Sequence, residues 1–367
     1  MPSSTTRSPA SRPSASPKTS TRSSERARWA PRPPPNSSRS RWRGPTARRS
    51  SGARNRASNR AKSLAALASA RHAAAAARFF FVGWLALAAG AVAAACPPAA
   101  TDRAALDALA RAEWNLDDDQ RRQALAIELL DCLSSPDPQL RDELAFAAIQ
   151  RWSRARQLAP ATLQKIRTTL LARLTADDPA GFARPFAALA LAEVVRADRV
   201  APFLSADERA ALVLGGTAYL AGVRDYRGFD EREGWRHGVA HGADLMLQLA
   251  VHPALDRAQF DALLAAVAAQ VMPAGHFYLY GEGDRLMAPV FYIGRRDMLS
   301  ADEWSAWFAA LAARLPRGAP TTQAALAARH DLAAFLLPLY VSLREQATPE
   351  MQARMLPGVT AALRTLD

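Results

Sequence analysis

Two histidines and an aspartate follow one another at helical spacing in a polar stretch of the chain. His237, His241 and Asp244 are separated by four and three residues, so on an α-helix they share one face within about 60°. Two imidazoles and a carboxylate suit zinc or a related divalent metal, and three protein ligands leave a position open for water. The spacing predicts a divalent-metal site, a hydrogen-bonded His/His/Asp network without metal, or a solvated polar face.

A Gly-flanked acidic turn offers further groups to that helix. Glu282 and Asp284 lie between glycines and an arginine, and Glu282 could act as an additional ligand or as a general base. The same turn is also typical of a helix start, with Asp284 as the N-cap of a helix over residues 285–293. Trp235 lies in the loop before the histidine-bearing helix and is expected beside the same groove.

Charged residues within apolar helices form a second candidate site. Arg141 and Asp142 lie inside an apolar-periodic segment. With Arg184 and Arg227 they favour either an ion-pair network between packed helices or an arginine-lined site for an anionic ligand.

The elements that must position these groups are helices. Apolar residues recur at helical spacing through residues 101–367, and strand signals are scarce. Ser205 with Glu208, and Ser300 with Glu303, have the spacing of capping boxes. We expect about eleven or twelve helices, with no strict repeat period. The domain over residues 101–367 is therefore predicted to be all-α, with stacked antiparallel helix pairs in an α-solenoid-like arrangement.

The positive charge of the chain is concentrated near its start. Residues 1–78 carry 18 basic residues and one acid, whereas the remaining 289 residues carry 29 basic and 33 acidic residues. The later part is thus mildly acidic, and we expect no nucleic-acid binding by the folded domain. Residues 1–62 are rich in Arg, Ser and Pro and lack Val, Ile, Leu and Phe, which predicts a disordered tail.

A hydrophobic segment over residues 71–98 separates the tail from the helical domain. No charge occurs between Arg78 and Asp102, and a basic flank followed by an apolar run is typical of a signal peptide or a membrane anchor. We therefore predict membrane association through residues 79–96, and a domain that is extracytoplasmic because its positive flank is N-terminal.

The two cysteines are too few for a disulfide framework or a Cys-based zinc site. Cys96 follows three alanines, as in a bacterial lipoprotein signal, and is the candidate for lipid attachment. Cys132 lies among apolar helix residues and is predicted to be a small core residue.

Residues about 115–345 resemble an uncharacterised bacterial family, domain of unknown function 2785. The most specific part is the run from Gly234-Trp235 through His237, His241 and Asp244; the resemblance also includes Arg141-Asp142, Arg184 and Glu282 with Asp284. It implies an all-α domain and supplies no activity, substrate or cofactor.

These observations support three functional hypotheses. The first is a ligand- or protein-binding module whose groove is lined by His237, His241, Asp244 and Glu282. The alternative is a metal-dependent hydrolase in which the first three hold the metal and Glu282 is the base. The third is a structural lipoprotein anchored through Cys96.

Overall fold

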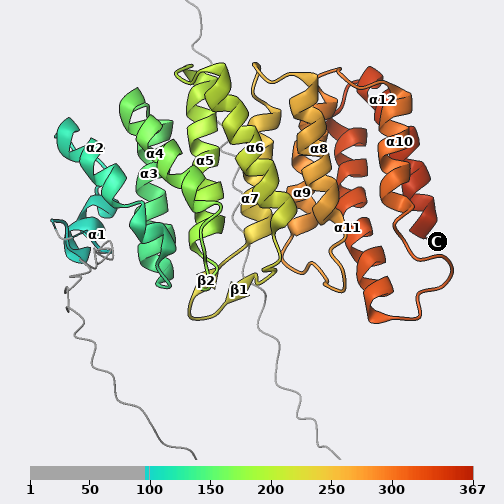
Figure 1. The fold of residues 1–367 in the computed structure, drawn as a ribbon, viewed down its shortest axis with the longest axis horizontal. Helices are drawn as coiled ribbons and strands as arrows, with labels where there is room; N and C mark the ends of the chain where they lie inside the picture. Colours follow the sequence, from blue (N-terminus) through green and yellow to red (C-terminus); the bar gives the residue numbers. More distant parts are fainter. Residues whose placement is uncertain (1–95, 99, 367) are drawn as a thin grey trace, which may run out of the picture. The chain divides into compact units, whose positions relative to one another are not determined.

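The computed structural model describes residues 96–98 and 100–366, which form a stack of α-helices (Figure 1). The helices are α1 (Arg103–Arg111), α2 (Asp119–Glu128), α3 (Ala147–Arg154), α4 (Pro160–Arg173), α5 (Ala183–Val200), α6 (Ala206–Gly222), α7 (Gly238–Ala250), α8 (Arg257–Val271), α9 (Glu282–Gly294), α10 (Ala301–Ala312), α11 (Gln323–Gln346) and α12 (Pro349–Leu363). Short 3₁₀ segments cover Asp131–Ser134 (η1) and Arg364–Leu366 (η3), and a π-helix covers Gln139–Phe146 (η2). The prediction of an all-α domain of stacked helix pairs is confirmed. The predicted tail and most of the hydrophobic segment lie outside the described residues.

The helices form two rows that pack against each other. In one row α5 packs along α7, α7 along α9, and α9 along α11; in the other α6 packs along α8. The rows meet where α4 contacts α5, α6 contacts α7 and α8 contacts α9. At the C-terminal end α12 packs on α10 and α11 (Figure 1). The start of α7 and the start of α9 therefore come from neighbouring helices of one row.

Local signals in the sequence set several helix starts. Ser205 and Ser300 each form a capping box with the glutamate three residues later, so both predicted capping boxes are confirmed. Asp137 accepts hydrogen bonds from the N–H groups of Gln139 and Leu140 at 3.0 and 3.3 Å. The segment that it starts is π-helical rather than a regular α-helix, a geometry that helical periodicity alone does not reveal.

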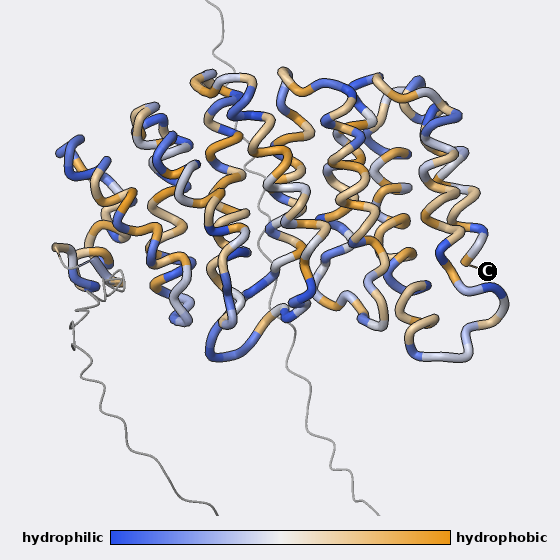
Figure 2. The backbone as a smooth tube through the Cα atoms, in the orientation of Figure 1, coloured by the Kyte–Doolittle hydropathy of each residue, from blue (hydrophilic) through white to orange (hydrophobic). Residues whose placement is uncertain are grey.

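The core is continuous along the stack and is made of aliphatic and aromatic side chains. Trp152, Phe260, Trp304, Phe308 and Phe335 are among its largest fully buried members, and burying each such side chain contributes about 1.5–3 kcal/mol. Figure 2 shows hydrophobic residues along the helices and hydrophilic ones in many of the connecting turns.

Two long connections leave the stack at one edge. Between α6 and α7 the chain forms a two-stranded antiparallel ribbon, β1 (Phe229–Asp230) and β2 (Gly234–Trp235), with Phe229 opposite Trp235. Gly234 has a φ of +71°, and a Cβ there would lie 2.9 Å from Pro138, so only glycine fits this close approach to the start of η2. The second connection, residues 272–281, joins α8 to α9.

Cys96 is joined to Cys132 by a disulfide bond. A sulfur in a disulfide has no valence left for a thioether to lipid, so the structure contradicts lipid attachment at Cys96. Cys132 is buried as predicted, but its sulfur is bonded rather than free. Our inference that two cysteines would not build a disulfide framework did not anticipate this single bond.

Within the described residues, one helix, α11, is long and apolar enough to cross a membrane by length and composition. Its buried side chains include Phe335, Leu336 and Leu339, and it packs on α9 and α12. A core helix of a stacked domain meets the same criteria.

Candidate functional site

His237, His241 and Asp244 do not all lie on one helix, although the rings of His237 and His241 are 5.9 Å apart between centroids. His237 is the N-cap of α7, with a left-handed backbone at φ 53°, and the helix begins only at Gly238. Only His241 and Asp244 lie on the helix itself. Helical periodicity therefore misplaced the first member of the set, because it assumed that the helix started before residue 237.

Asp244 is engaged by an arginine. Its carboxylate forms an ion pair with Arg285 on α9, including a 2.9 Å hydrogen bond from Arg285 Nε. Burial raises the pKa of Asp244 above its ordinary value, and Arg285 offsets this only in part. Among residues 96–98 and 100–366, no three His, Cys, Asp or Glu side chains are placed to hold a metal ion. The geometry gives no support to the metal-dependent hydrolase.

His241 points into the protein rather than toward a solvent-filled groove. It is buried, and its ring contacts Phe186 edge-on at 4.9 Å between centroids. Its Nδ1 atom has no hydrogen-bond partner in the described part of the chain. Burial, together with nearby His237 and Arg285, holds the pKa of His241 well below its ordinary value, so the ring is neutral.

His237 links the α6–α7 connection to the α8–α9 connection through a hydrogen bond. Its Nε2 lies 3.2 Å from the backbone carbonyl of Tyr280. Burial and the charge of Arg285 lower the pKa of His237 to about 4, so the ring is neutral at pH 7. Because a carbonyl only accepts, Nε2 must carry the hydrogen and donate it.

Arg141 and Asp142 form a structural pair at the base of the ribbon. The guanidinium of Arg141 is fully buried, donates to Asp142 at 2.7 Å, and lies 4.2 Å from the ring centre of Phe182. Its Nη2 also donates to the carbonyl of Glu233 at 2.9 Å. The pair thus fixes η2 to the turn of the ribbon instead of lining an open anion site.

Arg184 and Arg227 do not join that pair. Arg184 donates to the carbonyl of Leu174 at 2.8 Å, and Arg227 makes a bidentate contact with Asp225 within its own loop. Burial raises the pKa of Asp225, but hydrogen bonds from Arg227 outweigh burial and the pKa is lowered. The predicted single arginine network is therefore replaced by separate local pairs.

Four titratable side chains hold the backbone of the α8–α9 connection. The N–H of Tyr278 donates to Asp331 at 2.9 Å, and its carbonyl accepts from His330 at 3.1 Å. Two residues on, the N–H of Tyr280 donates to Glu282 at 2.9 Å, while its carbonyl accepts from His237. We call this arrangement the backbone clamp.

The clamp changes the roles that the sequence suggested for the acidic turn. Glu282 is buried, and its Oε2 atom accepts the hydrogen bond from the Tyr280 amide and so orders the loop. Asp284 is exposed in the first turn of α9, whose N-cap is Gly281. The predicted cap at Asp284 is wrong because the helix begins three residues earlier.

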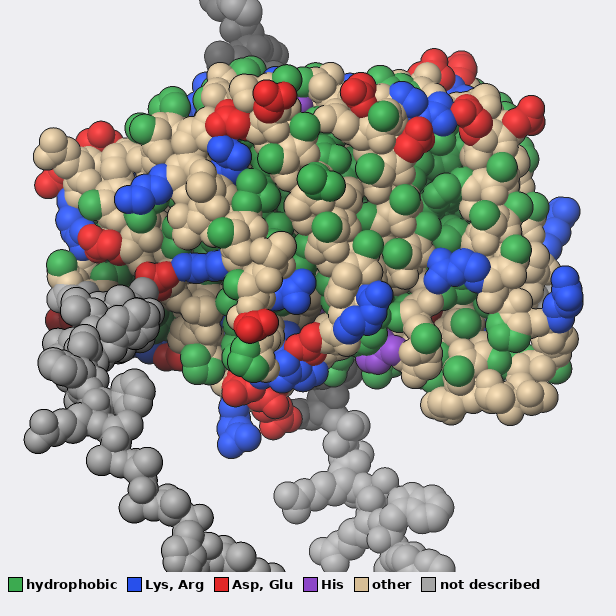
Figure 3. Space-filling view, viewed as in Figure 1, with side chains coloured by type: hydrophobic (Ala, Val, Ile, Leu, Met, Phe, Trp, Pro, Cys, Tyr) green, Lys and Arg blue, Asp and Glu red, His purple; other side chains and the backbone are tan. Residues whose placement is uncertain are grey.

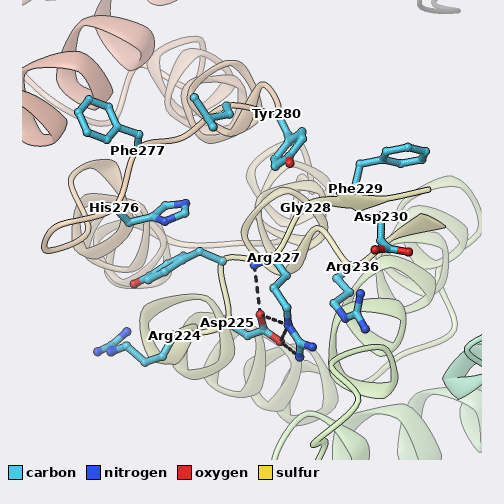
Figure 4. A pocket seen from close by; sticks show the side chains of 12 residues that line it. Arg224, Asp225, Arg227, Gly228, Phe229, Asp230, Arg236, His276, Phe277 and Tyr280 are labelled. Carbon is cyan, nitrogen blue, oxygen red and sulfur yellow. Dashed lines mark hydrogen bonds and ion pairs between the residues drawn. The ribbon is translucent and has the colours of Figure 1, made fainter. Parts of the chain in front are cut away.

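The two connections border an open hollow that we call the two-loop pocket. It has a volume of about 610 Å³ and is lined by residues 224–230 and Arg236 from one connection, and by His276, Phe277, Leu279 and Tyr280 from the other. Figure 4 shows aromatic rings on one side of the pocket and the Asp225–Arg227 pair on the other.

Ring contacts fasten the two sides of the pocket together. Tyr226 stacks on His276 at 4.8 Å, and Trp235 lies edge-on to Tyr280 at 5.6 Å. The ring of Tyr280 also covers Gly228, where a Cβ would lie only 2.0 Å from it. Trp235, predicted beside the groove, lies 4.3 Å from His237 between ring centroids, with the two rings tilted by 31°.

Charged groups of both signs surround this edge of the domain. Figure 3 shows acidic and basic side chains together where the ribbon projects. Arg236 is buried and donates to the carbonyl of Ala180 at 2.9 Å and to Glu233 at 2.7 Å. Arg224 forms no ion pair within the described residues and instead donates to the carbonyls of Ala221 and Val223.

The pocket was not predicted from the sequence, because aromatic residues such as those that line it are usually interpreted as core residues. Tyr226 and His276 carried no motif, and Asp331 is 53 residues from the amide that it binds. The one local signal was the clustering of rings in residues 276–280 next to glycines.

The fold and its loop-edge pocket define an all-α protein of stacked helix pairs. Residues 170–341 match a family described as "Protein of unknown function (DUF2785)". The resemblance to that family is thus confirmed over these residues, which include α5 to α10, most of α11, both connections and the clamp. Arg141 and Asp142 lie before the matched range. No curated protein and no solved structure matches the chain.

Proposed function

We propose that the helical domain is a binding module whose ligand lies in the two-loop pocket. The observation that carries this proposal is the pocket itself, about 610 Å³ in volume and lined in part by Tyr280, whose backbone the clamp holds. Ligand sites are typically concave, largely preformed and lined by apolar rings with a few polar groups. The binding role suggested by the sequence is retained, but its centre moves from His241 and Asp244 to the pocket beside His237.

Binding is favoured over catalysis by the engagement of the nearby titratable groups. Glu282 and Asp331 bind backbone amides, and Asp225 is paired with Arg227. A general base needs a lone pair within reach of a substrate proton. These carboxylates serve the loops instead.

The test is a ligand-observed NMR screen of small ring compounds against the purified full-length chain. We expect hits that are lost in the variant Phe229→Ala, because Phe229 is exposed at the pocket. The matched control is Tyr292→Ala, which removes an exposed ring at the far end of α9. A screen without hits, or hits that both variants retain, would contradict the proposal.

We also propose that the domain is extracytoplasmic and reaches the membrane through residues 79–96. What supports this is the Cys96–Cys132 bond, because disulfides persist in oxidising compartments and are rare in the cytosol. The charge pattern before the hydrophobic segment points the same way.

Alkylation tests directly whether the disulfide bond is present in the cell, since the chain has two cysteines. Protein isolated under thiol-trapping conditions from the native host should gain no iodoacetamide adduct before reduction and two adducts after it. Two adducts before reduction would show that the thiols are free in the cell and would overturn the proposal.

A further inference from the structure

The aromatic rings that this domain exposes are concentrated at the two-loop pocket. Phe229, Trp235 and Tyr280 are 48%, 36% and 40% exposed, and Tyr292 is the other large aromatic exposed among the described residues. The other phenylalanine and tryptophan side chains of the described residues are buried or partly buried. Exposed apolar patches with polar surroundings mark binding sites.

These three rings form one surface rather than three separate ones. Phe229 lies 5.0 Å from Trp235, and Trp235 lies 5.6 Å from Tyr280. The ribbon register places Phe229 opposite Trp235, and the clamp fixes Tyr280. A preformed aromatic surface binds the flat apolar face of a ring at little entropic cost.

Beside the rings lie hydrogen-bonding groups with unused capacity. Within the described residues, the Nη1 atoms of Arg227 and Arg236 have no hydrogen-bond acceptor, while their other nitrogens are bonded. On the acceptor side, Asp230 uses Oδ1 for the amides of Arg232 and Glu233 and leaves Oδ2 unbonded. Those amide bonds lower the pKa of Asp230, so it is an ionised acceptor at pH 7.

Fixed donors and a fixed acceptor next to aromatic faces match a polyhydroxylated ring. Neighbouring hydroxyl groups both donate and accept, whereas the C–H face of such a ring is apolar and packs on an aromatic surface. A phenylalanine side chain would use the rings but neither the donors nor the acceptor. We infer that the ligand of the two-loop pocket is a saccharide, an inference that rests on the proposed binding function.

The experiment is calorimetric titration of the full-length chain with soluble oligosaccharides and with one peptide. The probes are cellotetraose, maltotetraose, chitotetraose, trigalacturonate and the peptide acetyl-Phe-Gly-Phe-amide. We expect at least one oligosaccharide to bind more tightly than the peptide. A preference for trigalacturonate would indicate that the arginines select an acidic saccharide.

Two variants test the rings and the acceptor separately. Tyr280→Ala should weaken oligosaccharide binding about tenfold, which corresponds to about 1.4 kcal/mol. Asp230→Asn keeps the Oδ1 acceptor of the turn but loses the charge, and should weaken binding about fivefold, in line with a charge-assisted hydrogen bond. Tyr292→Ala should leave the affinity unchanged.

The outcomes separate this inference from the proposed function. If ring compounds bind in the NMR screen but only the peptide, or no oligosaccharide, binds in calorimetry, the saccharide assignment is wrong and the binding module stands. Oligosaccharide binding that Asp230→Asn leaves unchanged also overturns the assignment. If nothing binds in either experiment, both fail.

Discussion

Asp198 and Asp331 are both fully buried carboxylates, yet they lie in contrasting surroundings. Asp198, near the end of α5, accepts from the amides of Phe203 and Leu204 at 2.7 and 2.8 Å, and from Arg209 and His252. Asp331, on α11, accepts one amide hydrogen bond, and its Oδ2 atom has no partner in the described part of the chain.

The pKa values reflect that contrast. Burial raises the pKa of Asp198, but its hydrogen bonds outweigh burial and the pKa is lowered. For Asp331, burial dominates and raises the pKa to about 6. One carboxylate stabilises the stack, while the other holds the α8–α9 connection at a cost in stability. Buried groups left unsatisfied in this way are typical of regions constrained by something other than stability.

The largest effect should come from removing the well-bonded carboxylate. Asp198→Ala leaves two amides, an arginine and a histidine without their acceptor, so we expect a loss of about 4 kcal/mol in the free energy of unfolding. Urea denaturation at pH 7 measures it. The control Asp256→Ala removes an exposed helix cap and should cost about 1 kcal/mol. Equal losses for the two variants would show that Asp198 contributes no more to stability than an exposed helix cap.

Replacing Asp331, the poorly bonded carboxylate, should increase the free energy of unfolding at neutral pH instead of lowering it. Its folded pKa is raised, so the folded state holds the proton more tightly and loses stability as pH rises from about 4 to about 6. Asp331→Asn keeps the acceptor for Tyr278 without the charge. Relative to the wild type, it should gain about 2 kcal/mol between pH 4 and pH 7.

Denaturation of both proteins at several pH values tests this prediction. A stability difference independent of pH would mean that Asp331 titrates normally in the folded chain. Asp198 predicts the reverse slope, because a lowered pKa gives stability that is lost as pH falls.

A smaller effect should follow from disturbing the loop that Asp331 holds. Gly228→Ala places a methyl group 2.0 Å from the Tyr280 ring, so the ring must move. We expect a loss of about 1 kcal/mol, with faster amide hydrogen exchange confined to residues 224–237 and 276–281. Gly222→Ala, where a Cβ meets nothing within 4 Å, is the matched control. Exchange that rises across the whole stack would show that the pocket is not a separate unit.

The smallest effect is expected at Asp244, a partly buried carboxylate paired with an arginine. The Arg285 side chain is 45% exposed, and pairs of this kind contribute about 0–1 kcal/mol. Asp244→Asn should therefore change the free energy of unfolding by less than about 1 kcal/mol. Loss of a stoichiometric bound metal in this variant, measured by elemental analysis, would revive the metal-site hypothesis.

The parts that could be predicted from the sequence are those set by neighbouring residues. Ser205 and Glu208 determine a helix start within four residues, and the apolar period determines the helical class. His237 shows the limit, because its left-handed backbone depends on how the ribbon enters α7. Asp331 shows a second limit: a carboxylate on α11 meets the amide of Tyr278 only through the packing of α9 on α11.

The bond between Cys96 and Cys132 also bears on the order in which the domain matures. The two residues are 36 positions apart, and the segment between them contains α1 and α2. In a reducing environment the two ends of this segment would not be joined covalently. The N-terminal end of the stack would then be completed only after the two cysteines are oxidised. Once the bond has formed, cutting the chain at a peptide bond between residues 96 and 132 would leave the two pieces joined through the sulfur atoms.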